Sequence, residues 1–403
     1  MNPHPISEDH APDVALRLGW VSFFNDAASH VLARILPLFL TGVLGVSATF
    51  VGVVEGLAEG LAVFTKTFSG WLSDRAASRK KFVFGGYALS FLARVCYLLT
   101  FSPLVMGLSR VLDRVGKGLR CPARDAMVAD AALFGKAGRA FGITSRLDAL
   151  GAFAGISVVL WVGVGQGSLT LSMFRLCVWI ALPLGIIALL IMVFAVPRVP
   201  RISQAPKLSW QVPREIRGFL LLVFLFSLAN SSDAFLVLRA AGLGYGVREM
   251  LALFLGFNLI AALLAVPVGQ ASDRFGRVPF LAVGWLIYAV SYGAFAYVQG
   301  RIAFAVVLLA YGSFYGFTEG VMRALLADLL PPEKRGMGFG SLQLTLGLAT
   351  LLASPIMGAM LNGFGPKAAF LVTSGTAMAA VVGLALWGIG RSHRKFGNVR
   401  NPI

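Results

Sequence analysis

Apolar runs of about 20 residues recur along the whole chain, and they constrain its fold more than any other feature of the sequence. A helix needs roughly this length, about 20 residues, to cross the hydrocarbon core of a bilayer. The chain is 57% hydrophobic and 13% charged, whereas an ordinary soluble domain has about 25% charged residues. This composition indicates that lipid is the solvent for most of the 403 residues.

The pattern predicts an all-α transmembrane fold with twelve spanning helices, at residues 15–43, 48–72, 82–101, 104–130, 141–165, 170–196, 218–241, 248–272, 279–299, 302–329, 337–361 and 367–390. The longest polar break, 198–217, is rich in proline and basic residues and follows the sixth span. We therefore predict two six-helix bundles, 15–197 and 218–390. The break is a linker between them, and 1–14 and 391–403 form polar tails.

The distribution of basic residues predicts the orientation of these helices. If both tails are cytoplasmic, the inside loops and tail hold 20 Lys and Arg residues, and the outside loops hold 3. Such an excess is typical of cytoplasmic loops, and it accounts for much of the net charge of +17 without a nucleic-acid partner. The first 14 residues do not resemble a cleaved signal peptide. We expect a monomeric, multi-pass protein of the bacterial inner membrane.

Neither a metal site nor a cofactor is indicated. The cysteines, Cys96, Cys121 and Cys177, all lie in apolar segments and form no CxxC pair. An odd number within the membrane argues against a disulfide framework, so we interpret them as packing residues. No Walker A loop for ATP is present, and no nucleophile–base pair suggests an enzyme.

A short polar and basic loop occurs once in each half of the chain. The first copy begins at Gly70 and reads GWLSDRAASRKK, and the second begins at Gly269, 199 positions later, and reads GQASDRFGRV. In each copy a glycine permits close helix packing, an aspartate can bind a helix end, and basic residues anchor the loop in the cytoplasm. The loop resembles the signature that transporters of the major facilitator superfamily carry between helices 2 and 3 and again between helices 8 and 9.

This resemblance implies two matching bundles that rock around a cavity at the bilayer midplane, in an alternating-access cycle. It also implies a cytoplasmic gate made by the two loops, with the residues Gly70, Asp74, Arg75, Gly269, Asp273 and Arg274. A second repeat agrees with the duplication, because three residues recur 198 positions later, as Asp130 and Asp328, Gly138 and Gly336, and Gly142 and Gly340.

The predicted fourth helix concentrates basic residues. At about 100° per residue, its cations fall within an arc of about 120°: Arg110, Arg114, Lys117, Arg120 and Arg124. A charge at the bilayer centre costs about 2.5–3.5 kcal/mol, so it normally faces a cavity or a partner. One interpretation is a basic cavity wall that binds an anionic or zwitterionic group through Lys117, Arg120, Arg114 and Arg110. The alternative is a set of buried ion pairs, with Arg124 as a cytoplasmic anchor.

Several carboxylates in the first bundle are candidates for proton coupling. Asp26, His30 and Arg34 follow one another at intervals of one turn in the first helix. Asp and His can pass protons near neutral pH, and a D-x-x-x-H pair could also ligate a divalent metal, although two ligands are too few for a site. Packing against Glu55 or Arg110 is the structural alternative. We assign Arg34 to substrate binding.

The second helix carries Glu55 and Glu59 one turn apart, and two carboxylates so close repel each other when both are ionised. They are proton-carrier candidates, together with Asp113 on the fourth helix; a salt-bridge ladder to that helix is the equal alternative. The resemblance extends to Arg114-x-x-Lys117-Gly118, which is similar to the helix 4 signature whose arginine is linked to proton coupling.

The second bundle has a thinner polar set. Asn230 and Asp233 in the seventh helix are substrate candidates, and Glu319, one turn before Arg323 in the tenth, is a proton candidate. The fifth helix lacks the Gly-Pro signature of exporters in this superfamily, since Ile156 follows Gly155.

These observations predict a secondary active transporter, with no cofactor, that moves a small polar solute with negative charge and is driven by protons. The first alternative is proton-driven export of drugs or amphiphiles, which the Phe-rich spans favour. Two others are a membrane-embedded enzyme and a divalent-metal exporter.

Overall fold

The computed structural model describes residues 11–76, 78–99, 102–132, 136–163, 170–197, 212–230 and 233–397. Within them the chain is helical, with no strand. The first bundle contains α1 (Ala11–Gly42), α2 (Ala48–Ser73), α3 (Arg79–Leu99), α4 (Pro103–Ala131), α5 (Ala137–Trp161) and α6 (Leu171–Leu190), which a π-helical turn (Ile191–Ala195) extends.

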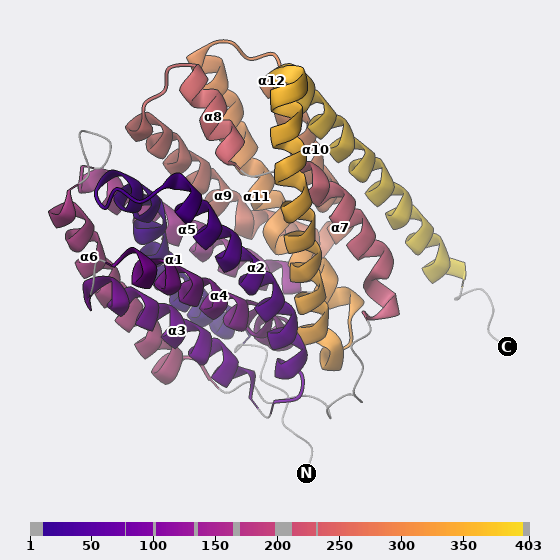
Figure 1. Cartoon of the computed structure of the whole chain (residues 1–403). Helices are drawn as coiled ribbons and strands as arrows, with labels where there is room; N and C mark the ends of the chain where they lie inside the picture. Colours follow the sequence, from indigo (N-terminus) through magenta and orange to yellow (C-terminus); the bar gives the residue numbers. More distant parts are fainter. Residues whose placement is uncertain are drawn as a thin grey trace.

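The second bundle begins with a 3₁₀ turn (Arg214–Ile216) and continues with α7 (Arg217–Ala229), α8 (Ala234–Gly242), α9 (Val247–Phe275), α10 (Arg277–Phe295) and α11 (Arg301–Leu329). Another 3₁₀ turn (Pro332–Lys334) leads into α12 (Arg335–Gly397). Figure 1 shows the two bundles side by side, the first in indigo and magenta and the second in orange and yellow.

The two bundles repeat the same sequence of helices. α4 and α11 both contain 29 residues, and they begin at Pro103 and Arg301. The third helices, α3 and α10, begin at Arg79 and Arg277, which are also 198 positions apart. The structure therefore has the predicted fold class, an all-α transmembrane protein of two pseudo-symmetric six-helix bundles.

Two features of the second bundle differ from the simple series of spans. The span predicted at 218–241 is divided, because α7 ends at Ala229 and α8 begins at Ala234. Asn230 has left helical geometry there, with φ −81° and ψ 73°. The last two predicted spans are continuous in α12 except for a kink at Gly365, whose φ of 78° is available to glycine without steric cost.

The predicted domain bounds stay a prediction. Residues 198–211 of the linker and residues 1–10 and 398–403 of the two tails lie outside the described part of the chain. Where the bounds do fall on described residues, α1 begins at Ala11 and so takes up part of the predicted tail 1–14. Likewise α12 runs to Gly397, past the predicted end of the last span at residue 390.

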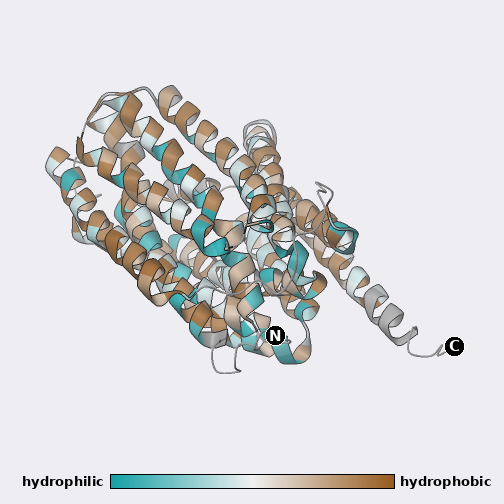
Figure 2. Ribbon diagram, turned by 90° about the horizontal axis from the view of Figure 1, so that it is seen from below, coloured by the Kyte–Doolittle hydropathy of each residue, from teal (hydrophilic) through white to brown (hydrophobic). Residues whose placement is uncertain are grey.

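Polarity is sorted between the outside and the middle of the molecule. Among the described residues, eight helical segments are long and apolar enough to cross a membrane. Hydrophobic residues cover much of the outer helix surface, and hydrophilic ones gather toward the middle (Figure 2). α1, α2 and α4 are not among the eight segments, because they carry charges inward. The next section shows where those charges lie.

Candidate functional site

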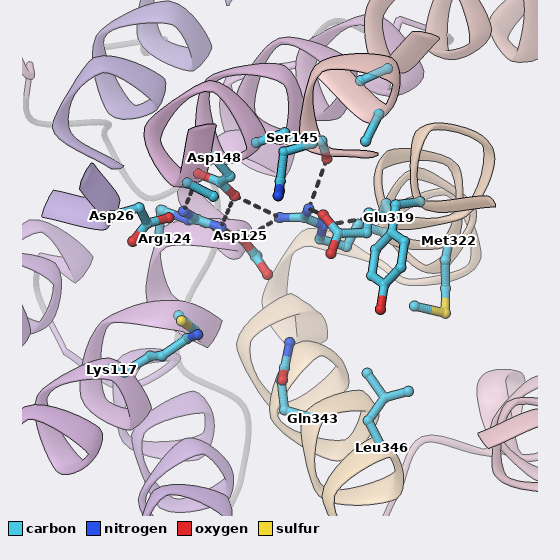
Figure 3. A pocket seen from close by; sticks show the side chains of 18 of the residues that line it. Asp26, Lys117, Arg124, Asp125, Ser145, Asp148, Glu319, Met322, Gln343 and Leu346 are labelled. Carbon is cyan, nitrogen blue, oxygen red and sulfur yellow. Dashed lines mark hydrogen bonds and ion pairs between the residues drawn. The ribbon is translucent and has the colours of Figure 1, made fainter. Parts of the chain in front are cut away.

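A cavity of about 440 Å³ lies between the two bundles. Its walls come from α1, α2, α4 and α5 of the first bundle and from α9, α11, α12 and the start of α8 in the second. Side chains from both bundles point into the same space (Figure 3). Its size lies in the range of roughly 300–1,000 Å³ that small-molecule sites have in proteins.

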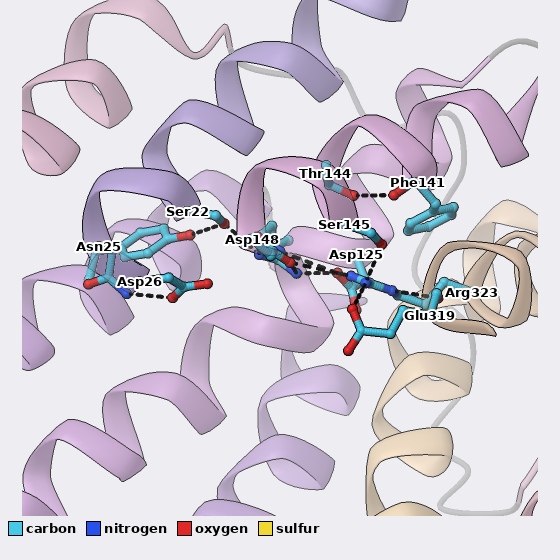
Figure 4. Close-up of polar contacts among 12 residues, drawn as sticks. Ser22, Asn25, Asp26, Asp125, Phe141, Thr144, Ser145, Asp148, Glu319 and Arg323 are labelled. Carbon is cyan, nitrogen blue, oxygen red and sulfur yellow. Dashed lines mark hydrogen bonds and ion pairs between the residues drawn. The ribbon is translucent and has the colours of Figure 1, made fainter. Parts of the chain in front are cut away.

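Two arginines and two aspartates form an ion-pair network at one side of the cavity. The Arg124 guanidinium donates to Asp148 Oδ1 at 3.2 Å and to Asp125 Oδ1 at 3.2 Å, and it also donates to the Ser22 hydroxyl. From the second bundle, Arg323 approaches Asp125 Oδ1 at 3.5 Å and Asp148 Oδ2 at 4.0 Å. Figure 4 shows this network spanning α4, α5 and α11.

Arg323 ties the bundles together. Its Nη2 atom also donates to the Ser145 hydroxyl on α5 at 2.8 Å, and it lies 3.4 Å from Glu319 Oε2 on its own helix. Arg323 and Asp125 are 198 positions apart, so they occupy corresponding places in the two halves of the repeat. The pair therefore lies where the equivalent helices α4 and α11 face each other.

Three further cations line the cavity on the side of the first bundle: Lys66, Lys117 and Arg120. The Lys117 side chain is exposed to the cavity, and neither lysine has a carboxylate oxygen within 4.0 Å among the described residues. Arg120 donates to the Ser90 hydroxyl at 2.9 Å and lies 4.8 Å from the centre of the Tyr87 ring. These positive charges are thus available to an anionic group, whereas those of Arg124 and Arg323 are already paired.

Acidic and titratable side chains line the rest of the cavity. Asp26 and His30 lie on α1, and Glu319 lies on α11. The Asp26 carboxylate accepts from Asn25 Nδ2 at 3.3 Å, and Asn25 in turn accepts from the buried Arg94 at 2.7 Å. These contacts hold the polar face of α1 in one orientation.

The second bundle contributes a carboxylate in an aromatic setting. Asp233, just before α8, lines the cavity with Asn258, Phe257 and Tyr315. The hydroxyl of Tyr311 donates to Asp233 Oδ1 at 3.2 Å, and that of Tyr315 donates to Oδ2 at 3.4 Å.

Other predicted site residues lie away from the cavity lining. Arg110 donates to both carboxylate oxygens of Glu55, at 2.8 and 3.1 Å, and Arg114 lies 3.2 Å from Glu59. Asp113 lies 4.0 Å from Arg110. These contacts form the salt-bridge ladder between α2 and α4 that the sequence left open as an alternative.

Two substrate candidates are placed differently. Asn230 stands at the break after α7 and is not among the cavity-lining residues. The side chain of Arg34 lies outside the described part of the structure.

The predicted gate residues lie where the bundles meet at the end of the molecule that carries the two repeated loops. The Asp74 carboxylate accepts from the backbone N–H groups of Gly336 and Met337, at 2.9 and 2.7 Å. In the other half, Asp273 accepts from Gly138 and Arg139, at 2.9 and 2.8 Å. Each aspartate thus binds the first turn of a helix in the opposite bundle, where the helix dipole favours an anion.

The glycines let these helices cross closely. A methyl group on Gly70 would overlap the carbonyl oxygen of Gly336, and one on Gly269 would overlap that of Gly138. The predicted Arg75 stacks on Trp71 at 4.0 Å, and Arg274 is exposed, so neither joins the ion pairs that surround the aspartates.

Those ion pairs use two other arginines. Arg79 pairs with Asp74 at 2.7 Å and with Asp130, and Arg277 pairs with Asp273 and, at 2.9 Å, with Asp328. The repeat of Asp130 as Asp328 was visible in the sequence. The equivalent spacing of Arg79 and Arg277 was the signal that could have found their partners.

The cavity also holds residues that the sequence did not single out as site residues: Lys66, Asp125, Asp148 and Arg323. Three of them were noted only as charges within spans. Among the described residues, no group of three or more His, Cys, Asp or Glu side chains could hold a metal ion.

Comparison with known proteins agrees with this architecture. A family model described as the Major Facilitator Superfamily matches residues 18–256 and 219–401. An uncharacterized MFS-type transporter of Methanocaldococcus jannaschii, MJ1317, is 31% identical over 381 residues, which cover 92% of this chain and 93% of the relative. The multi-drug resistance efflux pump PmrA of Streptococcus pneumoniae is 27% identical over 152 residues, which cover 37% of this chain and 38% of the pump.

A solved structure shows the same fold over nearly the whole chain. The human organic anion transporter MFSD10 (TETRAN) matches with a TM-score of 0.79 and 16% identity, covering 93% of this chain and 99% of that one.

Proposed function

The chain belongs to the major facilitator superfamily, whose members are membrane transporters and not enzymes, and we propose that it moves a small polar solute with negative charge. It is an integral, multi-pass membrane protein. The superfamily defines the kind of protein, and the cavity supports the choice of solute.

The observation that carries this proposal is the group of cations on α2 and α4. Lys66 and Lys117 face the cavity without a carboxylate oxygen within 4.0 Å among the described residues, and Arg120 is fixed by a serine hydroxyl. Unpaired cations within a membrane are costly, so they mark a place where an anion binds or passes. A carboxylate or phosphate that reached these groups would supply the missing partner.

The same cavity supports proton coupling. Asp26 and His30 line it one turn apart, close to the cationic wall, and Glu319 lines it from the second bundle. We propose Asp26 as the first proton site, because protonation of this carboxylate would change the charge beside the substrate. Glu55 and Glu59 are already engaged by Arg110 and Arg114, and they serve this role less well.

The transport cycle that we propose is alternating access. The loop-bearing end is closed here by Asp74 and Asp273, each bound to the opposite bundle. We propose that this end is cytoplasmic, that both tails lie on the same side, in the bacterial inner membrane, and that the protein works as a monomer. Release of both aspartates would let the bundles separate there.

Uptake into proteoliposomes tests the proposal. Purified protein is reconstituted and offered radiolabelled carboxylates, amino acids and phosphate esters, with neutral sugars as the comparison, with and without an imposed pH gradient. We expect an acidic or zwitterionic solute to accumulate, and Lys117→Gln with Arg120→Gln to reduce its uptake to the level of empty liposomes. Uptake of neutral sugars alone, or full uptake by the double variant, would overturn the proposal.

Export of drugs is the second candidate. It is favoured by the similarity to PmrA, whose match is confined to 37% of this chain. A drug-susceptibility panel on a strain lacking the gene separates the two, because only an exporter of drugs would leave the deletion strain hypersensitive. The likeness to the organic anion transporter, at 16% identity, supports the fold and not the solute.

A further inference from the structure

We propose that the cavity has a second subsite, built around Asp233, that binds a positively charged ammonium group, so that the solute is a zwitterion. This inference rests on the proposed function and narrows it. The anionic end of the solute would lie against Lys66, Lys117 and Arg120, and the cationic end against the second bundle.

The position of Asp233 follows from the division of the seventh span. α7 ends at Ala229, and Asp233 lies just before α8, so its carboxylate lines the cavity from non-helical backbone. The nearby end of α7 is its C-terminus, where helix carbonyl groups carry partial negative charge. The Ala229 carbonyl oxygen accepts from the Tyr288 hydroxyl at 2.8 Å, which fixes this end in place.

Two tyrosines orient the Asp233 carboxylate. The hydroxyls of Tyr311 and Tyr315 donate to its two oxygens, at 3.2 and 3.4 Å. Hydroxyl groups are neutral, so they hold the carboxylate in place without cancelling its charge. A carboxylate oriented in this way is suited to a cation, because binding needs little further ordering of the site.

Aromatic rings complete the subsite. Tyr315, Phe257 and Phe254 line the cavity with Asp233. The Phe257 and Tyr315 rings lie 5.0 Å apart in an edge-to-face arrangement, and the Phe254 and Phe257 rings lie 5.9 Å apart. Ring faces attract ammonium groups, most strongly when the cation is shielded from water. Asn258 lines the same wall, and its side-chain nitrogen already donates to the Phe254 carbonyl oxygen.

The two charged walls belong to different bundles. The cations come from α2 and α4, whereas Asp233 and the aromatic rings come from the second bundle. A purely anionic solute would meet repulsion from Asp233, and a purely cationic one would meet repulsion from the lysines. A solute with both charges satisfies both walls, and it would also draw the bundles together.

Thermal stabilisation of the purified protein tests the inference. The probes are a series of ω-amino carboxylates, the plain carboxylates of the same chain length, and the N-trimethylated amino carboxylates, all at neutral pH. We expect one chain length of amino carboxylate to bind about tenfold more tightly than its plain counterpart. Asp233→Asn, which keeps an acceptor for the tyrosine hydroxyls, should abolish this advantage and leave binding of the plain carboxylate unchanged or stronger.

Two more variants complete the design. Tyr315→Leu removes a ring while keeping the carboxylate, and it should weaken the trimethylated probes most; it also tests the subsite if Asp233→Asn fails to fold. Glu249→Gln, an exposed acidic residue outside the cavity, should change nothing. If plain carboxylates bind and the ammonium group brings no advantage in wild type, the subsite is refuted while the proposed function stands. If no carboxylate binds, the proposed function itself fails.

Discussion

At the side of the cavity, Arg124 and Arg323 share Asp125 and Asp148, and all four side chains are largely buried. The exposed fraction is 9% for each arginine and 3% for Asp125. Removing one member of a buried ion pair leaves a charge without a partner in a low dielectric, which costs far more than the loss of an exposed pair. Arg301 and Glu249 offer the comparison, because their side chains are each 49% exposed.

We expect Asp125→Asn to destabilise the protein by about 3 kcal/mol, at the low end for a buried pair because Asp148 still serves both arginines. Glu249→Gln should cost about 1 kcal/mol or less. Thermal unfolding of the two variants in the same detergent measures the difference. Equal melting temperatures would show that the network is not a structural tie between the bundles.

We expect Asp26→Asn to bind solute but to lose its response to a pH gradient, because the proposed proton site can no longer ionise. Glu55→Gln is the matched control, since Glu55 is held by Arg110 away from the cavity lining. Proteoliposome uptake with an imposed and a collapsed gradient measures both variants. Asp26→Asn would disprove the assignment by responding to the gradient as wild type does.

The roles of single charges were only partly predictable. Periodicity placed five cations of α4 within one arc, but an arc does not tell which neighbour faces each residue. Arg110 and Arg114 face Glu55 and Glu59 on α2, whereas Lys117 and Arg120 face the cavity. Arg124 lies in the ion-pair network, and not in the cytoplasmic loop where it was counted as an anchor. Such distinctions depend on helix packing, which the spacing within one helix does not contain.

At the scale of helices, the bundles are held together where α2 crosses α12 and where α5 crosses α9. Each crossing has glycine on both helices, and each has an aspartate bound to the first turn of the opposite helix. This close contact is short in sequence terms, so it can be made and broken as a unit.

We expect Gly70→Ala to push α2 away from α12, because the added methyl group would overlap the Gly336 carbonyl oxygen. Overpacking of this kind costs about 1–3 kcal/mol, enough to raise the population of the open gate roughly tenfold or more. The labelling rate of Met337→Cys, which is buried in the closed gate, reports this opening in a background without the native cysteines.

Gly60→Ala on the same helix is the matched control, since a methyl group there meets no atom within 4 Å. It should leave the labelling rate unchanged. If the two alanine variants label at the same rate, the glycine crossing does not control the gate.

Helix positions were largely predictable, because bilayer thickness sets their length and the chain repeats itself. The span predicted at 104–130 corresponds to α4, Pro103–Ala131. The break between α7 and α8 was not predicted, since the apolar run continues on both sides of Asn230. Its polar residues were noticed as a substrate candidate and not as an interruption, although unpaired backbone inside a membrane is tolerated only beside a cavity or other protein.

At the scale of the whole molecule, the account describes two bundles joined at one end and lined between them by charges of both signs. Transport requires that the joined end opens, and that the charged cavity is then accessible from that side. Membership of the superfamily follows from sequence and structure together, whereas the solute depends on side chains that no repeat determines.

The distance between the bundles at the gate tests this account most directly. Spin labels on Arg139→Cys and Phe275→Cys, in a background without the native cysteines, lie at the crossing of α5 and α9, where Asp273 binds the Arg139 N–H in the closed gate. Pulsed electron resonance in liposomes should show a short and a long distance, whose proportions change with pH and with added zwitterionic solute. A single short distance under every condition would contradict alternating access in this protein.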